Sequence, residues 1–346
     1  MSEAMIESLE LLSRGQALTV DQAYRLMDAI MAGQASPAQI GGALMALRVR
    51  GETVEELTGF ARAMRDHATP VAVRQHPLID TCGTGGDRSF TFNVSTVSAF
   101  VVAGAGLHVA KHGNRSATSK SGSADLLEAL GVELSSEPDR VADLIDEVGF
   151  GFLFAQHVHT SMRHAGPVRR ELGVRTVFNL LGPLTNPCAP EYQLLGVFAA
   201  EWVRPIAEVL GQLGVRRAMV VHGHGGLDEV SLSGPTRFCL VEGTTVQEGE
   251  LTPEDLGLSR YAPGSFVGGE PATNAIICQN ILGNAAPGPH LDMVLANAGV
   301  ALYVGGVVPS PKDGVALARQ VIQEGKALHV LEQLVAASHL QQRRDA

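Results

Sequence analysis

The sequence is poor in the features that mark several common protein classes. Four cysteines occur in 346 residues, none at a metal-binding spacing from another: Cys82, Cys188, Cys239 and Cys278. Such cysteines are typical of a reducing compartment rather than of a disulfide-linked secreted scaffold. No apolar run reaches transmembrane length, and the first residues are polar and acidic, unlike a signal peptide. We therefore expect a cytoplasmic protein without a membrane partner.

Positive charge is also scarce. The chain carries 26 Lys and Arg against 36 Asp and Glu, a net charge of −10, and it has no basic block. An acidic chain of this kind is a poor nucleic-acid binder, so no nucleic-acid partner is expected. Apolar residues make up 45% and charged residues 18%, which is typical of a globular enzyme with a large core. The length is sufficient for two domains.

Residues 1–70 are predicted to form a small all-helical domain that ends at Pro70. Capping boxes mark three helix starts, namely Thr19-x-x-Gln22, Ser36-x-x-Gln39 and Thr53-x-x-Glu56. Helices this short cannot bury their apolar faces alone, so they must pack on another domain or another subunit. Both alternatives stay open from the sequence, and a segment around 160–185 is expected to return to this domain.

Residues 71–346 are predicted to form an α/β domain with a mostly parallel central sheet flanked by helices. Short apolar runs alternate with helical patterns: Leu78–Thr81, Leu107–Ala110, Gly151–Phe154, Leu194–Phe198 and Ala218–Val221. Ligands bind such sheets in the turns that follow the strands. After Pro253 the pattern is helical, and it includes Asn274 and Asn297. These two could support a site, although solvent-facing positions are the simpler expectation.

The chain is organised around the segment Asp80–Asp87, which follows the first apolar run. It contains Gly83, Gly85 and Gly86, so few side chains keep a ligand away from the backbone N–H groups. Free N–H groups before a helix form an anion site, most often for phosphate. Asp87 would repel bare phosphate, which favours a phosphate that arrives with a divalent cation or sugar hydroxyls. The alternative is a tight turn without a ligand.

Three further polar segments follow later apolar runs. Residues 111–125 combine cations, hydroxyls and glycines, as a phosphate site needs, but could be a solvated loop. The His- and Arg-rich residues 157–175 could bind a carboxylate or form a solvated surface. Residues 222–229 end in Asp228-Glu229, a pair that suits Mg²⁺ better than zinc, because the nearby histidines lack cysteine or spaced partners. A plain turn before a strand at 230–232 is the alternative there.

Read in order, these motifs closely resemble the anthranilate phosphoribosyltransferases, in the nucleoside-phosphorylase-like phosphoribosyltransferase family. The resemblance runs nearly end to end and is carried by Gly83–Asp87, Asn93–Thr96, Lys111–Arg115, Ser121–Asp125, Pro167–Arg169 and Asp228-Glu229. It implies a helical domain beside an α/β domain and a homodimer formed through the helical domain. It also implies transfer of the phosphoribosyl group from phosphoribosyl pyrophosphate (PRPP) to anthranilate, with Mg²⁺, in tryptophan biosynthesis.

The resemblance assigns roles to individual positions. PRPP would be held by Gly83, Gly86, Asp87, Thr91, Asn93, Val94, Ser95, Thr96, Lys111, His112, Gly113, Asn114, Arg115, Ser116, Ala117, Thr118, Ser119 and Ser123. Anthranilate would be bound by Gly83, Asn114 and Arg169, and Mg²⁺ by Ser95, Asp228 and Glu229. Lys111 and Asp87 are the expected catalytic residues. Their role is electrostatic, because the charge develops on pyrophosphate and the attacking amine is already neutral.

Two departures and two alternatives accompany this interpretation. Thr160 and Ser161 stand where relatives usually have Pro-Ala, and Gly166 stands where they carry a larger residue. Both changes border the acceptor side. A pyrimidine nucleoside phosphorylase would share the fold but use phosphate and a nucleoside, and Lys111–Arg115 with Asp228-Glu229 favours the transferase. A non-catalytic nucleic-acid-binding relative should have a basic surface and eroded loops, and the sequence shows neither.

Overall fold

A seven-stranded sheet forms the centre of the molecule. The computed structural model describes residues 3–87, 89–116, 120–284 and 287–340, and within them the sheet order is β3-β2-β1-β4-β5-β6-β7. The strands are β1 (Leu78–Gly83), β2 (His108–Gly113), β3 (Phe150–Phe154), β4 (Tyr192–Gly196), β5 (Arg217–Gly223), β6 (Thr236–Glu242) and β7 (Thr245–Leu251). The first five of that order run parallel, and β6 and β7 run antiparallel. The prediction of a mostly parallel sheet is confirmed.

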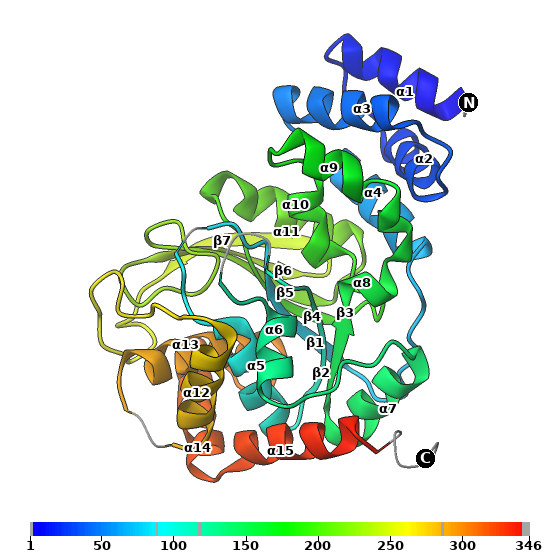
Figure 1. Ribbon diagram of the computed structural model, residues 1–346. Helices are drawn as coiled ribbons and strands as arrows, with labels where there is room; N and C mark the ends of the chain where they lie inside the picture. The colour runs from blue at the N-terminus through cyan, green and yellow to red at the C-terminus, as the bar shows by residue number, and fades with distance from the viewer. Residues whose placement is uncertain (1–2, 88, 117–119, 285–286, 341–346) are drawn as a thin grey trace.

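A group of short helices, here called the helical lobe, sits at one end of the molecule (Figure 1). It comprises α1 (Glu3–Ser13), α2 (Val20–Met31), α3 (Pro37–Arg50) and α4 (Val54–Asp66), joined by α9 (Gly166–Leu172) and α10 (Phe178–Leu181). All three predicted capping boxes are present, at Thr19, Ser36 and Thr53. Helix α9 contacts α3, and α10 contacts α4. The chain therefore returns to this lobe after β3.

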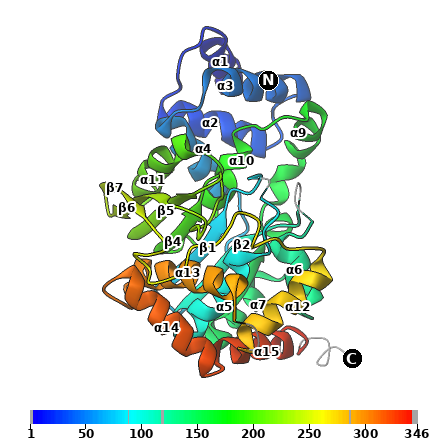
Figure 2. The same cartoon turned by 90° about the vertical axis from the view of Figure 1, so that its left-hand side faces the viewer.

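The other helices cover the sheet and connect its strands, as Figure 2 shows from the side. They are α5 (Val94–Gly104), α6 (Ser123–Ala129), α7 (Pro138–Val148), α8 (Ala155–Val158), α11 (Val203–Gln212), α12 (Pro271–Leu282), α13 (Pro289–Val304), α14 (Pro311–Gln323) and α15 (Lys326–Ser338). Short 3₁₀ turns occupy Thr160–Arg163, Gly182–Leu184 and Ala200–Trp202. No helix of the described ranges combines the length and the apolar character that a membrane span requires.

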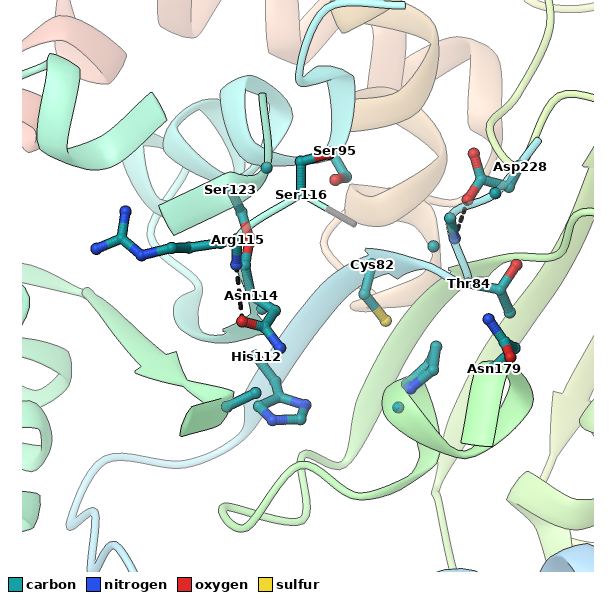
Figure 3. A pocket seen from close by; sticks show the side chains of 18 of the residues that line it. Cys82, Thr84, Ser95, His112, Asn114, Arg115, Ser116, Ser123, Asn179 and Asp228 are labelled. Carbon is teal, nitrogen blue, oxygen red and sulfur yellow. Dashed lines mark hydrogen bonds between the residues drawn. The ribbon is translucent and has the colours of Figure 1, made fainter. Parts of the chain in front are cut away.

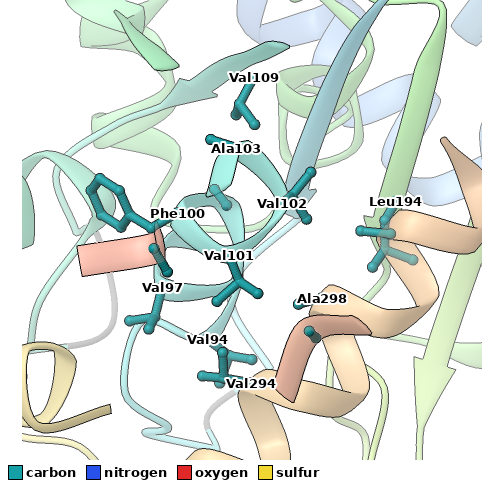
Figure 4. Close-up of a cluster of buried hydrophobic side chains, with 14 of the residues drawn as sticks. Val94, Val97, Phe100, Val101, Val102, Ala103, Val109, Leu194, Val294 and Ala298 are labelled. Carbon is teal, nitrogen blue, oxygen red and sulfur yellow. The ribbon is translucent and has the colours of Figure 1, made fainter. Parts of the chain in front are cut away.

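Alternating strand residues direct the core to the two faces of the sheet. On β4, Leu194 packs with α5, α13 and α14, whereas Leu195 packs with α11 and the helical lobe. Figure 4 shows the first of these clusters, where Leu194 lies beside Val294 and Ala298 of α13. The second cluster is continuous from the lobe into β4 and β5. The domain boundary at 70/71 therefore stays a prediction, because one hydrophobic cluster crosses it.

Candidate active site

One large cavity opens where the loops after β1 and β2 face the helical lobe. Its volume is about 1070 Å³. The glycine loop, the residues after β2, the acidic pair after β5 and the segment of α9 and α10 all line it. Figure 3 shows this cavity from close by, with Asp228 on one side and Asn114 and His112 on the other. The predicted site segments after β1, β2, β3 and β5 thus converge on one space.

Two backbone N–H groups hold the start of the glycine loop. The Thr84 N–H donates to the Gly196 carbonyl at 2.9 Å, and the Gly85 N–H donates to Asp228 Oδ2 at 2.7 Å. Gly85 and Gly86 have φ values of +67° and +75°, which only glycine adopts without strain. One of the loop N–H groups expected for phosphate is therefore occupied by a carboxylate of the acidic pair.

The acidic pair lies beside Asp87 and Ser95, with Asp228 buried and Glu229 half-buried. Burial and the neighbouring charge of Asp87 raise the pKa of Asp228 to about 7. Burial, with the charge of Asp228, also raises the pKa of Glu229, while the Ser95 N–H donates to Glu229 Oε1 at 3.2 Å. Burial and nearby negative charge thus disfavour the ionised carboxylates, and a bound cation would relieve that cost. The predicted ligands Ser95, Asp228 and Glu229 thus lie together.

The composition of this cluster is compatible with Mg²⁺. Among the described residues, no three His, Cys, Asp or Glu side chains are arranged to hold a metal on their own. Mg²⁺ is usually held by one or two carboxylates and completes its shell with water and phosphate oxygens. A carboxylate pair that lines a cavity with room for phosphate groups fits that requirement.

Lys111 is buried beneath this cluster on β2. Its side chain is 2% exposed, and Nζ donates to the Thr81 carbonyl and to Ser95 Oγ. The ammonium group also lowers the pKa of Glu229, against the larger effect of burial. Lys111 therefore offsets the negative charge of the site from below. Asp87, the other residue predicted as catalytic, accepts a hydrogen bond from the Ser89 N–H at 3.2 Å.

The loop after β2 contributes fewer free donors than its sequence suggests. The Arg115 guanidinium bonds Glu128 at 2.6 and 2.7 Å and Asp125 at 3.0 Å, and it points away from Asp228 in Figure 3. The Ser116 N–H donates to Asp125 at 3.1 Å. Ser123 Oγ donates to the Asn114 carbonyl at 3.3 Å, beside Gly113. Ala117, Thr118 and Ser119 lie outside the described residues, so their predicted contacts remain predictions.

The start of α5 completes the PRPP side of the cavity. Asn93 Nδ2 donates to the Ser121 carbonyl at 3.0 Å, and Asn274 Nδ2 donates to Asn93 Oδ1 at 2.9 Å. The predicted residues Val94 and Thr96 also border the cavity, although the Val94 side chain lies in the core. Thr91 borders it from a bridge to Val267. Asn274 is 2% exposed, so the solvent-facing expectation for it is wrong.

The acceptor side contains a histidine pair that the sequence did not single out. The rings of His112 and His159 pack edge to face, with their centroids 5.1 Å apart. Burial lowers the pKa of His112 to about 3 and that of His159 to about 4, so both rings are neutral at pH 7. Their Nε2 atoms are buried and have no partner among the described residues. His112, predicted to touch PRPP, thus extends toward the acceptor side.

Arg169 and Asn114 border the same end of the cavity. The Arg169 guanidinium lies over the Phe178 ring at 4.9 Å, and burial lowers its pKa. Gln156 Nε2 reaches Asn114 Oδ1 at 3.4 Å. A Cβ atom at Gly166 would find its nearest neighbour, an Arg170 nitrogen, at 3.7 Å, so a larger residue fits there. Gly83, Asn114 and Arg169, the predicted acceptor residues, therefore line the same cavity, and Gly83 lies directly beside Asp228.

Comparison with known proteins decides the family. Residues 6–68 match the helical bundle domain of the glycosyl transferase family, and residues 75–328 match its a/b domain. The anthranilate phosphoribosyltransferase of Rubrobacter xylanophilus is 50% identical over 332 residues, which are 96% of this chain and 97% of that protein. The chain belongs to the anthranilate phosphoribosyltransferase family.

Solved structures of this family agree with that assignment. The crystal structure of the Thermus thermophilus anthranilate phosphoribosyltransferase has a TM-score of 0.91 and 49% identity, covering 96% of this chain and 99% of its own. The Saccharomyces cerevisiae enzyme was solved in complex with PRPP and Mg, with a TM-score of 0.88, 30% identity and coverage of 97% and 98%. It was also solved with 4-fluoroanthranilate, with a TM-score of 0.86, 28% identity and coverage of 96% and 98%.

These similarities confirm the predicted family, fold and enzymatic activity, and the Saccharomyces cerevisiae relative binds Mg, the predicted cofactor. The individual site residues, the dimer and the cytoplasmic location remain predictions.

Proposed function

We propose that this member of the anthranilate phosphoribosyltransferase family transfers the phosphoribosyl group of PRPP to the amine of anthranilate within the cavity described above. The observation that carries this proposal is one cavity lined by an acidic pair as well as by Arg169 and two neutral histidines. A metal-bound diphosphate and a small aromatic carboxylate need opposite surroundings. This cavity offers both within one space.

On the donor side, the chain supplies charge and shape. Asp228, Glu229 and Ser95 would hold Mg²⁺, which when bound neutralises pyrophosphate oxygens. The loop 83–87 and the start of α5 present backbone groups to the phosphoribosyl unit. Buried Lys111 keeps a positive charge beneath Glu229. These groups stabilise the charge that develops on the leaving pyrophosphate without a proton transfer.

On the acceptor side, the chain supplies orientation. Arg169 would form a two-point contact with the anthranilate carboxylate, since a guanidinium matches a carboxylate in shape and charge. Asn114 and the edge of Gly83 would border the ring and its amine. The neutral His112 and His159 rings add no positive charge beside the amine, so its lone pair stays available for attack. The contribution of these residues is proximity and alignment.

The deciding experiment follows the loss of anthranilate fluorescence after protein, Mg²⁺ and PRPP are added. We expect the signal to fall only when all three are present, and pyrophosphate to appear in equal amount. A nucleoside phosphorylase would instead consume a pyrimidine nucleoside with inorganic phosphate. Turnover of that pair, without loss of anthranilate fluorescence, would overturn the proposal.

The proposal includes a homodimer formed through the helical lobe. Two exposed apolar residues support it, Ile6 on α1 (47% exposed) and Val49 on α3 (82% exposed). Met27, Met31 and Met64 do not support it, because they are buried within the lobe. We therefore propose the outer faces of α1 and α3 as the partner surface.

A further inference from the structure

Arg175 forms a contact that the roles assigned above leave unused. It lies between α9 and α10, borders the cavity, and donates from Nη2 to the Gly86 carbonyl of the glycine loop. The same guanidinium lies over the Phe198 ring, 4.2 Å from the ring centroid. An ion that is both stacked and hydrogen-bonded is held in a defined orientation. The glycine loop is therefore joined to a residue of the returning segment.

Phe198 is itself part of the support of the same loop. Its backbone N–H donates to Thr84 Oγ1 at 3.0 Å, and the Thr84 N–H donates to the Gly196 carbonyl at 2.9 Å. The strand end at Gly196 thus fixes the start of the loop. Arg175, stacked on Phe198, fixes its end at Gly86. The loop is held at both ends by one connected group of residues.

The Gly86 carbonyl matters because of the peptide bond that follows it. In a trans peptide the C=O and the next N–H point in opposite directions. A carbonyl held by Arg175 therefore sets the direction of the Asp87 N–H. Glycine loops can rotate such a peptide at little steric cost, and Gly86 has a φ of +75°. A Cβ atom at Gly86 would lie 3.2 Å from Arg175 Nη2, so the two groups are closely fitted.

Arg175 is in turn anchored by its own chain. Val177 is fully buried and Phe178 is 5% exposed, both in the hydrophobic cluster of the helical lobe. The Thr176 N–H donates to Asn179 Oδ1 at 3.0 Å, which fixes the turn into α10. The guanidinium of Arg169 also lies over the Phe178 ring. One segment therefore holds the arginine proposed for the acceptor and the arginine that holds the donor loop.

We infer that Arg175 is a positioning residue for PRPP: it holds the Gly86–Asp87 peptide in the orientation that presents the Asp87 N–H to the phosphoribosyl pyrophosphate. This inference rests on the proposed function. Loss of a charged hydrogen bond to the loop should weaken PRPP binding by roughly ten- to a hundredfold. The anthranilate side should be little affected, because Arg169 keeps its contact with Phe178.

The test compares Arg175→Ala with Arg175→Lys and with Arg216→Ala. Arg216 is an exposed arginine over the Tyr192 ring at 5.7 Å, and it does not border the cavity, so it controls for loss of a stacked arginine. For Arg175→Ala we expect a rise of roughly tenfold or more in the KM of PRPP and a nearly constant KM of anthranilate. Arg175→Lys should recover part of the loss, because lysine can still donate one hydrogen bond. Arg216→Ala should change neither KM.

Two results would overturn the inference. One is an unchanged KM of PRPP in a folded Arg175→Ala protein; the other is a rise confined to anthranilate. If Arg175→Ala does not fold, Phe198→Leu provides the test, since it removes the stacked ring but keeps the backbone contacts. It should then raise the KM of PRPP in the same direction, and an unchanged value would contradict the inference.

Calorimetric measurement of PRPP binding in the presence of Mg²⁺ distinguishes failure of the proposed function from failure of the role proposed for Arg175. No binding to the unaltered chain would refute the proposed function. Equal binding to the unaltered chain and to Arg175→Ala would refute only the role of Arg175.

Discussion

The side-chain amide of Asn297 bonds both backbone groups of Val230. Oδ1 accepts from the Val230 N–H at 2.9 Å, and Nδ2 donates to the Val230 carbonyl at 3.1 Å. A third hydrogen bond, to the Met293 carbonyl at 3.0 Å, fixes the amide on α13. Because Val230 directly follows Glu229, a helix far along the chain sets the position of the acidic pair.

Asn297→Ala should disturb both stability and the metal site. Removal of the amide leaves the buried Val230 N–H and carbonyl unpaired, which costs about 1–3 kcal/mol each at most. We expect a lower melting temperature and a higher Mg²⁺ concentration for half-maximal turnover. Thermal unfolding and Mg²⁺ titration measure the two effects. A lower melting temperature with an unchanged Mg²⁺ requirement would show that Asn297 stabilises the fold without positioning the acidic pair.

The double variant Asp228→Ala, Glu229→Ala should lose most of its turnover and shift its dependence on Mg²⁺. The pair supplies the carboxylates of the proposed metal site, and their loss leaves Ser95 with too few charged partners. Turnover at limiting and saturating Mg²⁺ is the measurement. A matched control is Glu248→Ala with Glu250→Ala, two exposed carboxylates on β7. Wild-type turnover of the site variant at limiting Mg²⁺ would refute the metal assignment.

Arg169→Ala should raise the KM of anthranilate by roughly ten- to a hundredfold, because a charge-assisted two-point contact contributes about 1.5–3 kcal/mol. The KM of PRPP should stay nearly constant at saturating Mg²⁺. Arg169→Lys should recover only part of the affinity, since an ammonium cannot make the two-point contact. A rise confined to PRPP would contradict the assignment. Unchanged kinetics would mean that Gly166 and Thr160 have reshaped the pocket around another anchor.

His159 should make the fold less stable in acid. Its folded pKa of about 4 lies below the unfolded value of about 6.5, so between these pH values the unfolded chain binds more protons. The free energy of unfolding should therefore fall as the pH drops from about 6.5 to 4.

His159→Gln removes this contribution. Asp80, whose pKa burial raises to about 6, affects both proteins alike. Denaturant unfolding at several pH values gives the free energy of unfolding of both proteins. Between pH 6.5 and 4, this free energy should fall more steeply for the unaltered protein than for His159→Gln. Parallel curves would contradict the assignment of a neutral, buried His159.

Light scattering should show a homodimer at micromolar concentration. Ile6→Glu and Val49→Glu together place charges on the outer faces of α1 and α3 and should shift the protein toward the 36.4 kDa monomer. The same pair of charges should leave the melting temperature of the monomer nearly unchanged, because both side chains are exposed. A wild-type protein that is only monomeric under these conditions would refute the dimer.

Local signals were reliable where a short pattern determines the structure. The capping boxes at Thr19, Ser36 and Thr53 form as predicted, and the helical pattern predicted after Pro253 is present in α12 to α15. The hairpin of β6 and β7 was missed, although Gly243-Thr244 between two alternating runs is a hairpin signal. The expected alternative strand at 230–232 is absent, because Asn297 takes up both backbone groups of Val230.

Side-chain partners were less predictable, because they come from segments far apart in the chain. Arg115 was expected at phosphate, yet Asp125 and Glu128 bond it. Asn297 was expected in solvent but is 1% exposed. An asparagine can be buried when its amide forms hydrogen bonds with a backbone segment far away in the chain, and no local sequence pattern indicates such a partner. The sequence did not distinguish His159 from the other histidines, because its contact with His112 depends on the fold.

The two edges of the sheet determine how this chain avoids aggregation. At one edge, β7 carries the exposed charges of Glu248 and Glu250, and like charges of this kind discourage strand addition by a second molecule. At the other edge, β3 is buried along its whole length and contacts α7 and α15. Addition of a further strand is therefore discouraged by charge at β7 and by the covering helices at β3. Exposure of the β3 edge should therefore require displacement of α7 or α15.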